Sequence, residues 1–310
     1  MSGFTVAIVG SPGVAPEMGK KGTQSDLTLY NVTRDGHHTT VVEPTQFPEK
    51  FPPLLSALAM ADRAVLVLYE LSRPVAEAIA TVDLTDVPTE VLAADAVGDD
   101  SLRTVFRGSR LAEAPVLRMG LPELRERIET WRVPETSGPV QVPIDHSFPV
   151  KGVGAVALGV VRRGTLHSHD ALRLWPEGKT VEIRSIQVHD VDVKQAVTGE
   201  RVGVALKGVD SDELTRGQIL APPEGLRAGS ELLARDVRQC KYYKTDWGEG
   251  SKLHLSLGLQ NVPAVIGPKT EGGFRVQTDR PVVYSEGQAG FILDLSATAG
   301  PRIVARVNLG

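Results

Sequence analysis

The chain has 310 residues and a formal net charge of −4, and 41% of its residues are hydrophobic and 23% charged. This composition is typical of an ordinary globular protein, and the length allows two or three domains with a substantial core. The sequence has no apolar run of the roughly 18 residues that a membrane helix needs. Its first residues, MSGFTVAIVG, carry no basic region ahead of their apolar run, so we expect a cytoplasmic protein without a membrane partner.

The charges are unevenly divided along the chain. Residues 1–137 hold 13 Lys and Arg against 19 Asp and Glu, whereas residues 138–310 hold 21 against 19. The acidic first part is unsuited to binding a polyanion. We therefore expect any contact with nucleic acid to come from local basic patches in the second part.

The first part alternates predicted strands and helices. The strands are expected at Thr5–Val9, Leu27–Val32, Thr39–Glu43, Ala64–Leu68, Glu90–Ala94 and Pro115–Arg118. The helices are expected at Pro48–Ala61, Arg73–Thr81, Leu121–Trp131 and near Ser101–Gly108. The second and third strands are joined across Arg34-Asp35-Gly36, where the Asp-Gly pair favours a hairpin. This order predicts an open, mostly parallel sheet with helices on both faces.

A boundary follows at residues 133–139, VPETSGP, because two prolines and a glycine end the preceding helix and cannot sustain another. From Phe148 to Leu220, short runs rich in Val, Ile and Leu alternate with Gly, Pro and Asp turn signals. That rhythm is typical of a small antiparallel barrel. We expect Gly152 and Gly154 to bend its first strand.

A second break at residues 221–225, APPEG, precedes a last segment with a similar rhythm. We expect its strands at Glu231–Gln239, Lys252–Leu259, Gly273–Thr278, Val282–Tyr284, Ala289–Leu295 and Ile303–Val307.

The middle stretch carries a family resemblance. The run FPVKGVGAVALGVVRRGTL, the hairpin around Glu177, Gly178 and Lys179, the phrase IRSIQVHDVDVKQAVTGERVGVALKGVD and the ending RGQIL resemble the second domain of the EF-Tu/SelB class of translational GTPases. The resemblance is greatest to the selenocysteine elongation factor branch of archaea and eukaryotes. It implies an α/β plus all-β fold, with a degenerate Ras-like P-loop GTPase domain at 1–137 and β-barrel domains at 138–222 and 223–310.

The phosphate-binding motif that this resemblance implies is altered. A P-loop has the form G-x-x-x-x-G-K-[ST], so that backbone N–H groups hold the phosphates. After Val9 the chain reads GSPGVAPEMGKKGT, with five residues between Gly13 and Gly19 and with Lys21 where Ser or Thr should follow Lys20. We expect a remodelled glycine loop, whose remnant nucleotide-binding candidates are Gly10, Gly13, Gly19, Lys20, Lys21 and Thr23.

Three further GTPase motifs are missing or altered. The D-x-P-G-H motif is replaced by residues 43–48, EPTQFP, in which only Glu43 could take the place of the aspartate. The guanine-recognition motif N-K-x-D is reduced to Asp95 in AADA, and the last motif, S-A-K/L, is replaced by VLRMG. No group remains to sense a γ-phosphate or to position the attacking water. We expect no catalytic residue, no cofactor and no ordinary GTP hydrolysis, and we keep GTP or GDP with Mg²⁺ as an alternative.

Two sets of residues are RNA-binding candidates. In the last segment, basic and aromatic residues suited to phosphate contact and base stacking lie together: Arg235, Arg238, Lys241, Tyr242, Tyr243 and Lys244. The alternative is a strand edge with solvated charges and packed aromatic rings. In the middle barrel, against which the resemblance would place an aminoacyl end, the basic candidates are Lys151, Arg162, Arg163 and Arg184.

We do not expect a metal site. His37 and His38 lie at a hairpin, and His167 and His169 at a turn, without a third distant ligand. Cys240 is the only cysteine, which excludes an internal disulfide and a cysteine-based zinc cluster. We expect His189 to shape a strand end and Cys240 to be a buried or neutral thiol.

These observations favour an elongation-factor-like protein that binds a tRNA or a ribosomal element, and not DNA, without ordinary GTP hydrolysis. One alternative is a protein-interaction or regulatory module that keeps the shape of such a factor and meets a protein partner in the translation machinery. Another is a divergent GTP-binding protein.

Overall fold

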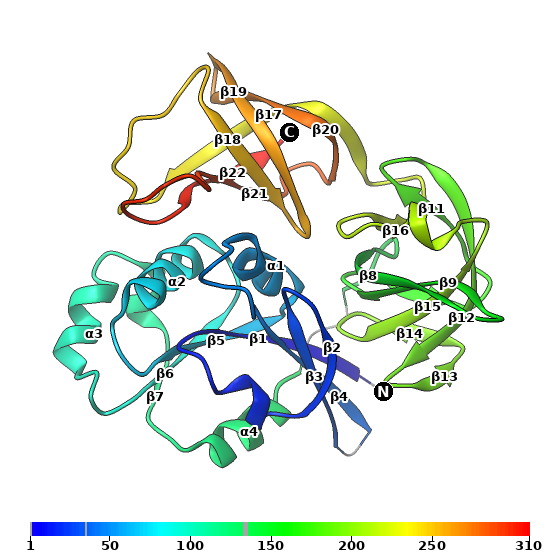
Figure 1. Ribbon diagram of the computed structural model, residues 1–310, viewed down its shortest axis with the longest axis horizontal. Helices are drawn as coiled ribbons and strands as arrows, with labels where there is room; N and C mark the ends of the chain where they lie inside the picture. Colours follow the sequence, from blue (N-terminus) through cyan, green and yellow to red (C-terminus); the bar gives the residue numbers. More distant parts are fainter. Residues whose placement is uncertain (1, 35, 133–135) are drawn as a thin grey trace.

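A computed structural model describes residues 2–34, 36–132 and 136–310 of the chain. Asp35 of the predicted Asp-Gly turn and residues 133–135 of the predicted boundary lie outside the described residues. The chain forms an α/β part and two barrels, which lie around a common centre (Figure 1). In the part of the chain that the structure describes, no helix is long and apolar enough to span a membrane.

The N-terminal part is built on a seven-stranded sheet of order β2-β3-β4-β1-β5-β6-β7. Its parallel strands are β1 (Ser2–Gly10), β4 (His37–Glu43), β5 (Arg63–Leu68), β6 (Thr89–Ala93) and β7 (Val116–Leu117), whereas β2 (Lys20–Gln24) and β3 (Thr28–Arg34) add an antiparallel edge. The helices are α1 (Pro52–Met60), α2 (Arg73–Leu84), α3 (Asp99–Phe106) and α4 (Leu121–Glu129). The predicted open, mostly parallel sheet with helices on both faces is confirmed.

Strand β2 was not predicted, because the segment was read as a glycine loop up to Thr23. The structure has instead a three-residue 3-10 turn at Ala15–Glu17, followed by β2 along the sheet edge. Val14, Ala15 and Met18 are buried in the same cluster as Leu124 and Ile128 of α4. These apolar side chains cover the sheet beside α4. The backbone N–H and C=O groups of β2 form hydrogen bonds with β3, as those of a helix would have done within the helix.

The middle part is a barrel formed by β8 (Val142–Val150), β9 (Gly154–Val160), β11 (Ala171–Trp175), β12 (Lys179–Val188), β15 (Arg201–Lys207) and β16 (Ile219–Ala221). The pairing of β11 with β12 closes the ring. Strand β13 (Val191–Val193) pairs with β12, whereas β10 (Thr165–His167) and β14 (Gln195–Val197) form a separate two-stranded sheet. The prediction that Gly152 and Gly154 bend one strand was wrong, because Gly152 lies in the turn between β8 and β9 and Gly154 begins β9, with φ of 80° and 102°.

The C-terminal part is a closed barrel of order β17-β20-β19-β18-β21-β22. Its strands are β17 (Arg227–Gln239), β18 (Lys252–Leu257), β19 (Gln260–Thr270), β20 (Gly273–Tyr284), β21 (Ala289–Leu293) and β22 (Ile303–Leu309). Strand β19 was not predicted, because Pro263, Gly267 and Pro268 are residue types typical of loops. In the structure, Gly267 and Pro268 lie within the register shift between Ile266 and Lys269. Gly273–Tyr284 is one strand, where two were predicted.

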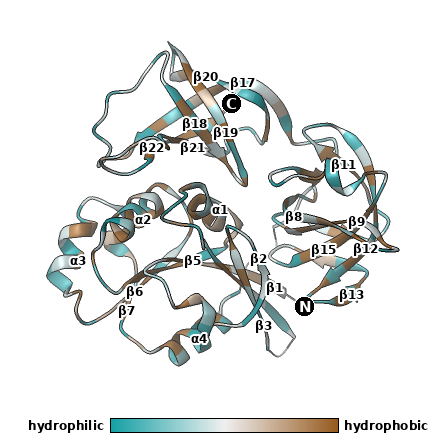
Figure 2. Cartoon of the chain, in the orientation of Figure 1, coloured by the Kyte–Doolittle hydropathy of each residue, from teal (hydrophilic) through white to brown (hydrophobic). Residues whose placement is uncertain are grey.

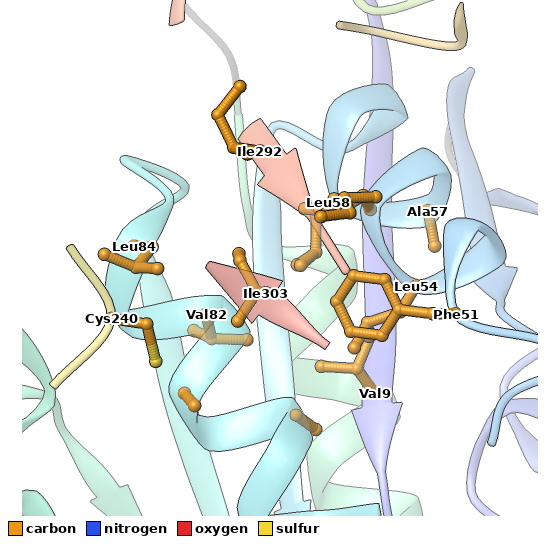
Figure 3. Packing of buried hydrophobic residues seen from close by; sticks show 14 of the residues in the cluster. Val9, Phe51, Leu54, Ala57, Leu58, Val82, Leu84, Cys240, Ile292 and Ile303 are labelled. Atoms are coloured by element: carbon orange, nitrogen blue, oxygen red, sulfur yellow. The ribbon is translucent and has the colours of Figure 1, made fainter. Parts of the chain in front are cut away.

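One hydrophobic core joins the N-terminal part to the C-terminal barrel. Phe51 and Leu58 of the α1 region and Val82 of α2 belong to the same buried cluster as Ile292 and Ile303 of the barrel (Figure 3). Helix α1 is hydrophobic on almost all sides, as its colour in Figure 2 shows. A helix of that kind is stable only when it is covered on two faces, and here the sheet and the barrel cover it.

Truncation of a side chain in this joint core should destabilise both parts. Leu58 is 1% exposed, and Leu58→Ala should lower the free energy of unfolding by about 2–5 kcal/mol, measured by urea denaturation. The control Leu71→Ala, at a side chain that is 45% exposed, should change it by no more than about 0.5 kcal/mol. Equal effects of the two substitutions would contradict a core shared by the two parts.

Candidate functional site

The candidate nucleotide site lies at the carboxyl edge of the parallel strands, where open α/β sheets bind their ligands. The loop after β1 is held against β5 there: Ser11 N donates to Val67 O at 2.9 Å, and Tyr69 N donates to Ser11 Oγ at 3.0 Å. Gly10 has a φ of 102°, and a Cβ on it would lie 2.3 Å from Val67 O. Gly10 is thus required by the close contact between two strands.

The other candidates of the phosphate loop are not gathered around a common point. Gly13 is exposed before the 3-10 turn, whereas Lys20, Lys21 and Thr23 lie on β2 beyond the buried Met18. No α-helix begins between β1 and β2, where every residue is described, and the 3-10 turn at Ala15–Glu17 has only three residues. The row of free N–H groups that a helix N-terminus offers to a phosphate is therefore missing from this loop.

Glu43, the candidate for the aspartate of the D-x-P-G-H motif, accepts a hydrogen bond from the neighbouring strand. Tyr30 on β3 donates its hydroxyl to Glu43 Oε2 at 3.1 Å. Burial, together with the charge of Glu43, raises the pKa of Tyr30 to about 12. The carboxylate therefore has a partner within the sheet.

Arg118, at the end of β7, is the residue that the sequence interpretation missed. Its guanidinium donates to Ala94 O at 2.8 Å, to Val97 O at 2.9 Å and to Asp99 Oδ1 at 2.7 Å. The hydrogen bond from Arg118 lowers the pKa of Asp99. Arg118 thus ties together the loops after β6 and β7, which correspond to the two guanine-binding motifs. Asp95, with a side chain that is 97% exposed, lies 3.7 Å away at the rim.

The basic and aromatic candidates of the C-terminal barrel lie mainly against the N-terminal part. Arg238 donates to Asp83 O at 2.9 Å, Lys241 to Arg107 O at 2.7 Å and Tyr242 to Val105 O at 3.2 Å. The side chains of these three residues therefore hold two parts of the chain together. Their RNA-binding role stays a prediction.

The remaining candidates of that barrel divide between core and surface. Tyr243 is buried and donates to Asp294 Oδ2 at 2.9 Å, and burial raises its pKa to about 12. Lys244 is exposed and donates to Lys241 O at 2.7 Å, and Arg235 is exposed near the chain end. Of the six candidates in this barrel, Tyr243 is the one whose side chain is buried.

The middle-barrel candidates fall into two groups. Arg162 bridges to the N-terminal part, with its Nη1 2.8 Å from Asp62 Oδ1 and 2.9 Å from Met60 O, and Arg163 Nε donates to Ser137 O at 3.0 Å. Lys151 lies in the exposed β8–β9 turn, and Arg184 Nη1 donates to Val153 O of that turn at 3.1 Å.

A histidine pair links the N-terminal sheet to the middle barrel. The rings of His38 on β4 and His189 after β12 are 4.4 Å apart, and Thr33 Oγ1 lies 3.1 Å and 3.3 Å from their Nδ1 atoms. Burial, with the neighbouring His38 and Arg201, lowers the pKa of His189 to about 4. His38 and Glu200 also line a cavity of about 220 Å³ between the two parts. Among the described residues, no group of three or more His, Cys, Asp or Glu could hold a metal ion.

Comparison with known proteins gives matches over the whole chain. Residues 154–221 match the family model for elongation factor Tu domain 2. An uncharacterized protein of Methanocaldococcus jannaschii is 33% identical over 96% of this chain and 97% of its own length. The selenocysteine-specific elongation factor of the same organism is 28% identical over 88% of this chain, which spans 63% of that factor.

Solved structures match the fold. The elongation factor SelB of Methanococcus maripaludis, solved with the GTP analogue GppNHp, superimposes with a TM-score of 0.84 at 19% identity, covering 100% of this chain and 79% of its own. A bacterial selenocysteine-specific elongation factor gives a TM-score of 0.81 at 18% identity, covering 99% of this chain and 58% of its own. At these identities the likeness concerns the fold alone.

The buried histidine pair predicts a pH dependence of stability. Because the pKa of His189 in the folded chain is about 4, below its ordinary value of 6.5, its contribution is complete above pH 6.5 and is lost as the pH falls towards 4. The loss is up to roughly 3 kcal/mol. His189→Asn, which tolerates the positive φ at this position, should flatten the decline of unfolding free energy between these pH values in urea titrations.

The same substitution at His167, the exposed last residue of β10, is the control and should keep the wild-type pH profile. An unchanged profile in the His189 variant would contradict this role of the pair.

Proposed function

The chain belongs to the EF-Tu/SelB-like class of translational GTPases, and we propose that it binds a tRNA or another translational RNA without ordinary GTP hydrolysis. The observation that carries the proposal is an α/β part followed by two barrels, as in elongation factors, with Val14, Met18 and Arg118 of the chain itself packed and hydrogen-bonded near the carboxyl edge of the sheet. We propose that its domains are residues 1–137, 138–222 and 223–310. We also propose that the protein is located in the cytoplasm.

Three features support the loss of hydrolysis. Met18 is buried and no α-helix follows β1 before β2, so the backbone donors for phosphates are lacking. Arg118 occupies two carbonyl groups of the loop after β6, which would frame a guanine. Glu43 is already hydrogen-bonded to Tyr30 and stands in a segment with no histidine to position water.

RNA binding is supported by the exposed basic residues that remain available. Lys151 lies in the turn between β8 and β9, Arg184 Nη1 donates to Val153 O of the same turn, and Phe148 on β8 is 39% exposed. Cations and an exposed ring on one hairpin suit the phosphate and base of an unpaired nucleotide. Arg163 and Arg235 are further exposed candidates, whereas Arg162, Arg238 and Lys241 already join the three parts.

A second candidate is a protein-interaction module that keeps the shape of an elongation factor. The observation in its favour is the acidic N-terminal part, together with the use of three predicted RNA contacts in the interface between parts. Such a module would meet a protein of the translation machinery and would bind tRNA no better than any other polyanion.

A filter-binding titration with tRNA tests the RNA proposal. Binding should weaken steeply between about 50 and 200 mM salt, because phosphate contacts release counterions. Lys151→Ala and Arg184→Ala should each weaken binding several-fold and reduce the salt slope by about one. The control Lys179→Ala should bind as the wild type does, because that ammonium already holds Glu213 at 2.7 Å. Absence of binding at the lowest salt would overturn the RNA proposal and favour the protein module.

Calorimetry with GTP and GDP in the presence of Mg²⁺ tests the loss of nucleotide chemistry. We expect no saturable heat up to about 1 mM nucleotide, which corresponds to binding weaker than about −4 kcal/mol, and no phosphate release above the blank. Tight binding together with turnover at the rate of a working elongation factor would refute this part of the proposal.

A further inference from the structure

The segment Pro44–Phe51 connects β4 to α1, and it replaces the motif that responds to the γ-phosphate in the resembling GTPases. In GTPases, such switch segments are ordered by the γ-phosphate and its Mg²⁺ and are released after hydrolysis. Here the segment is held by a side chain of the C-terminal barrel.

Arg302, just before β22, makes the contact. Its backbone N and its Nε donate to Glu77 Oε1 at 2.8 Å and 3.0 Å, and its Nη2 donates to Glu77 Oε2 at 2.6 Å. The same Nη2 donates to Pro48 O at 2.9 Å. The side chains of Arg302 and Glu77 are 17% and 10% exposed, so water screens this forked pair weakly.

The guanidinium also lies against two aromatic rings of the segment. Its central carbon is 5.2 Å from the ring centroid of Phe51 and 5.9 Å from that of Phe47, within the range of a cation–π contact. Phe51 is 1% exposed and belongs to the joint core with Ile303, and Figure 3 shows it beside Val9 and Leu54. The segment cannot leave its position without breaking the hydrogen bond from Arg302 to Pro48 O and exposing the ring of Phe51.

Other contacts between the same two parts act in the same direction. Arg73 Nη2 donates to Thr298 O at 2.6 Å, and Arg306 forms an ion pair with Asp86. Together with Arg238 on Asp83 O, they surround the joint core with hydrogen bonds.

We propose that Arg302 replaces the nucleotide as the group that orders the segment Pro44–Phe51, and that it locks the N-terminal part and the C-terminal barrel in one ligand-independent arrangement. Glu77 is its positioning partner on α2. The lock fixes the relative position of the two parts whether or not the chain binds RNA. In GTPases the corresponding segment responds to the nucleotide, whereas here the segment Pro44–Phe51 forms a permanent structural contact.

Hydrogen exchange measured on the full chain by mass spectrometry tests the lock. In the wild type, GTP or GDP with Mg²⁺ should leave the exchange of residues 44–60 unchanged. Arg302→Ala, without any nucleotide, should raise exchange there and in residues 292–304 by about tenfold or more, because local opening becomes easier. Arg302→Lys keeps the charge but loses the fork and should give an intermediate effect. The control Arg227→Ala removes an ion pair with Glu286 on the surface of the C-terminal barrel. It should leave the exchange of both regions unchanged.

Two results would overturn the proposal. The first is a change of exchange in residues 44–60 of the wild type on adding nucleotide. The second is wild-type exchange in these residues in the Arg302→Ala protein. If that protein does not fold, Glu77→Gln removes the negative charge of the Arg302–Glu77 pair at nearly constant side-chain volume. Hydrogen exchange in residues 44–60 and 292–304 of that variant then gives the test.

Discussion

The hydrophobic core that runs from the N-terminal sheet into the C-terminal barrel is the constraint on which the rest of the structure depends. Helix α1 has few polar residues, so it needs apolar surface on two sides. The sheet supplies one side, and Ile292 and Ile303 of the barrel supply the other. The two parts therefore stabilise one another, and the position of the barrel follows from the burial of α1 and α2.

Around this core, arginine side chains join the parts by forked or multiple hydrogen bonds. Arg162 bridges the middle barrel to Asp62, Arg216 bridges it to Asp26 at 2.6 Å, and Arg302 bridges the C-terminal barrel to Glu77. Guanidinium groups suit such sites because they remain charged and satisfy several acceptors at once. These arginines are used for contacts between the parts of the chain. Basic residues that the sequence offers for RNA binding are therefore not all free on the surface.

The nucleotide edge of the sheet shows the same principle on a smaller scale. Where a phosphate-binding helix would pack beside α4, Val14, Ala15 and Met18 fill the space. In the loop after β6, Arg118 satisfies the carbonyl groups of Ala94 and Val97. Polar groups that leave water need such hydrogen-bond partners, and at this edge the chain's own side chains supply them.

The sequence by itself determined the order of strands and helices in the first part, the barrel rhythm of the middle stretch and the family resemblance, because each depends on local periodicity and on motifs of fixed spacing. It failed at β2 and β19, where glycine and proline concealed strands that pair through register shifts. Only the tertiary structure decided that Arg118 and Arg302 complete the nucleotide edge and the interface, and that Arg238, Lys241 and Tyr242 face the N-terminal part. Their partners lie far away in the sequence, as Glu77 does for Arg302, so no local pattern could pair them before the chain had folded.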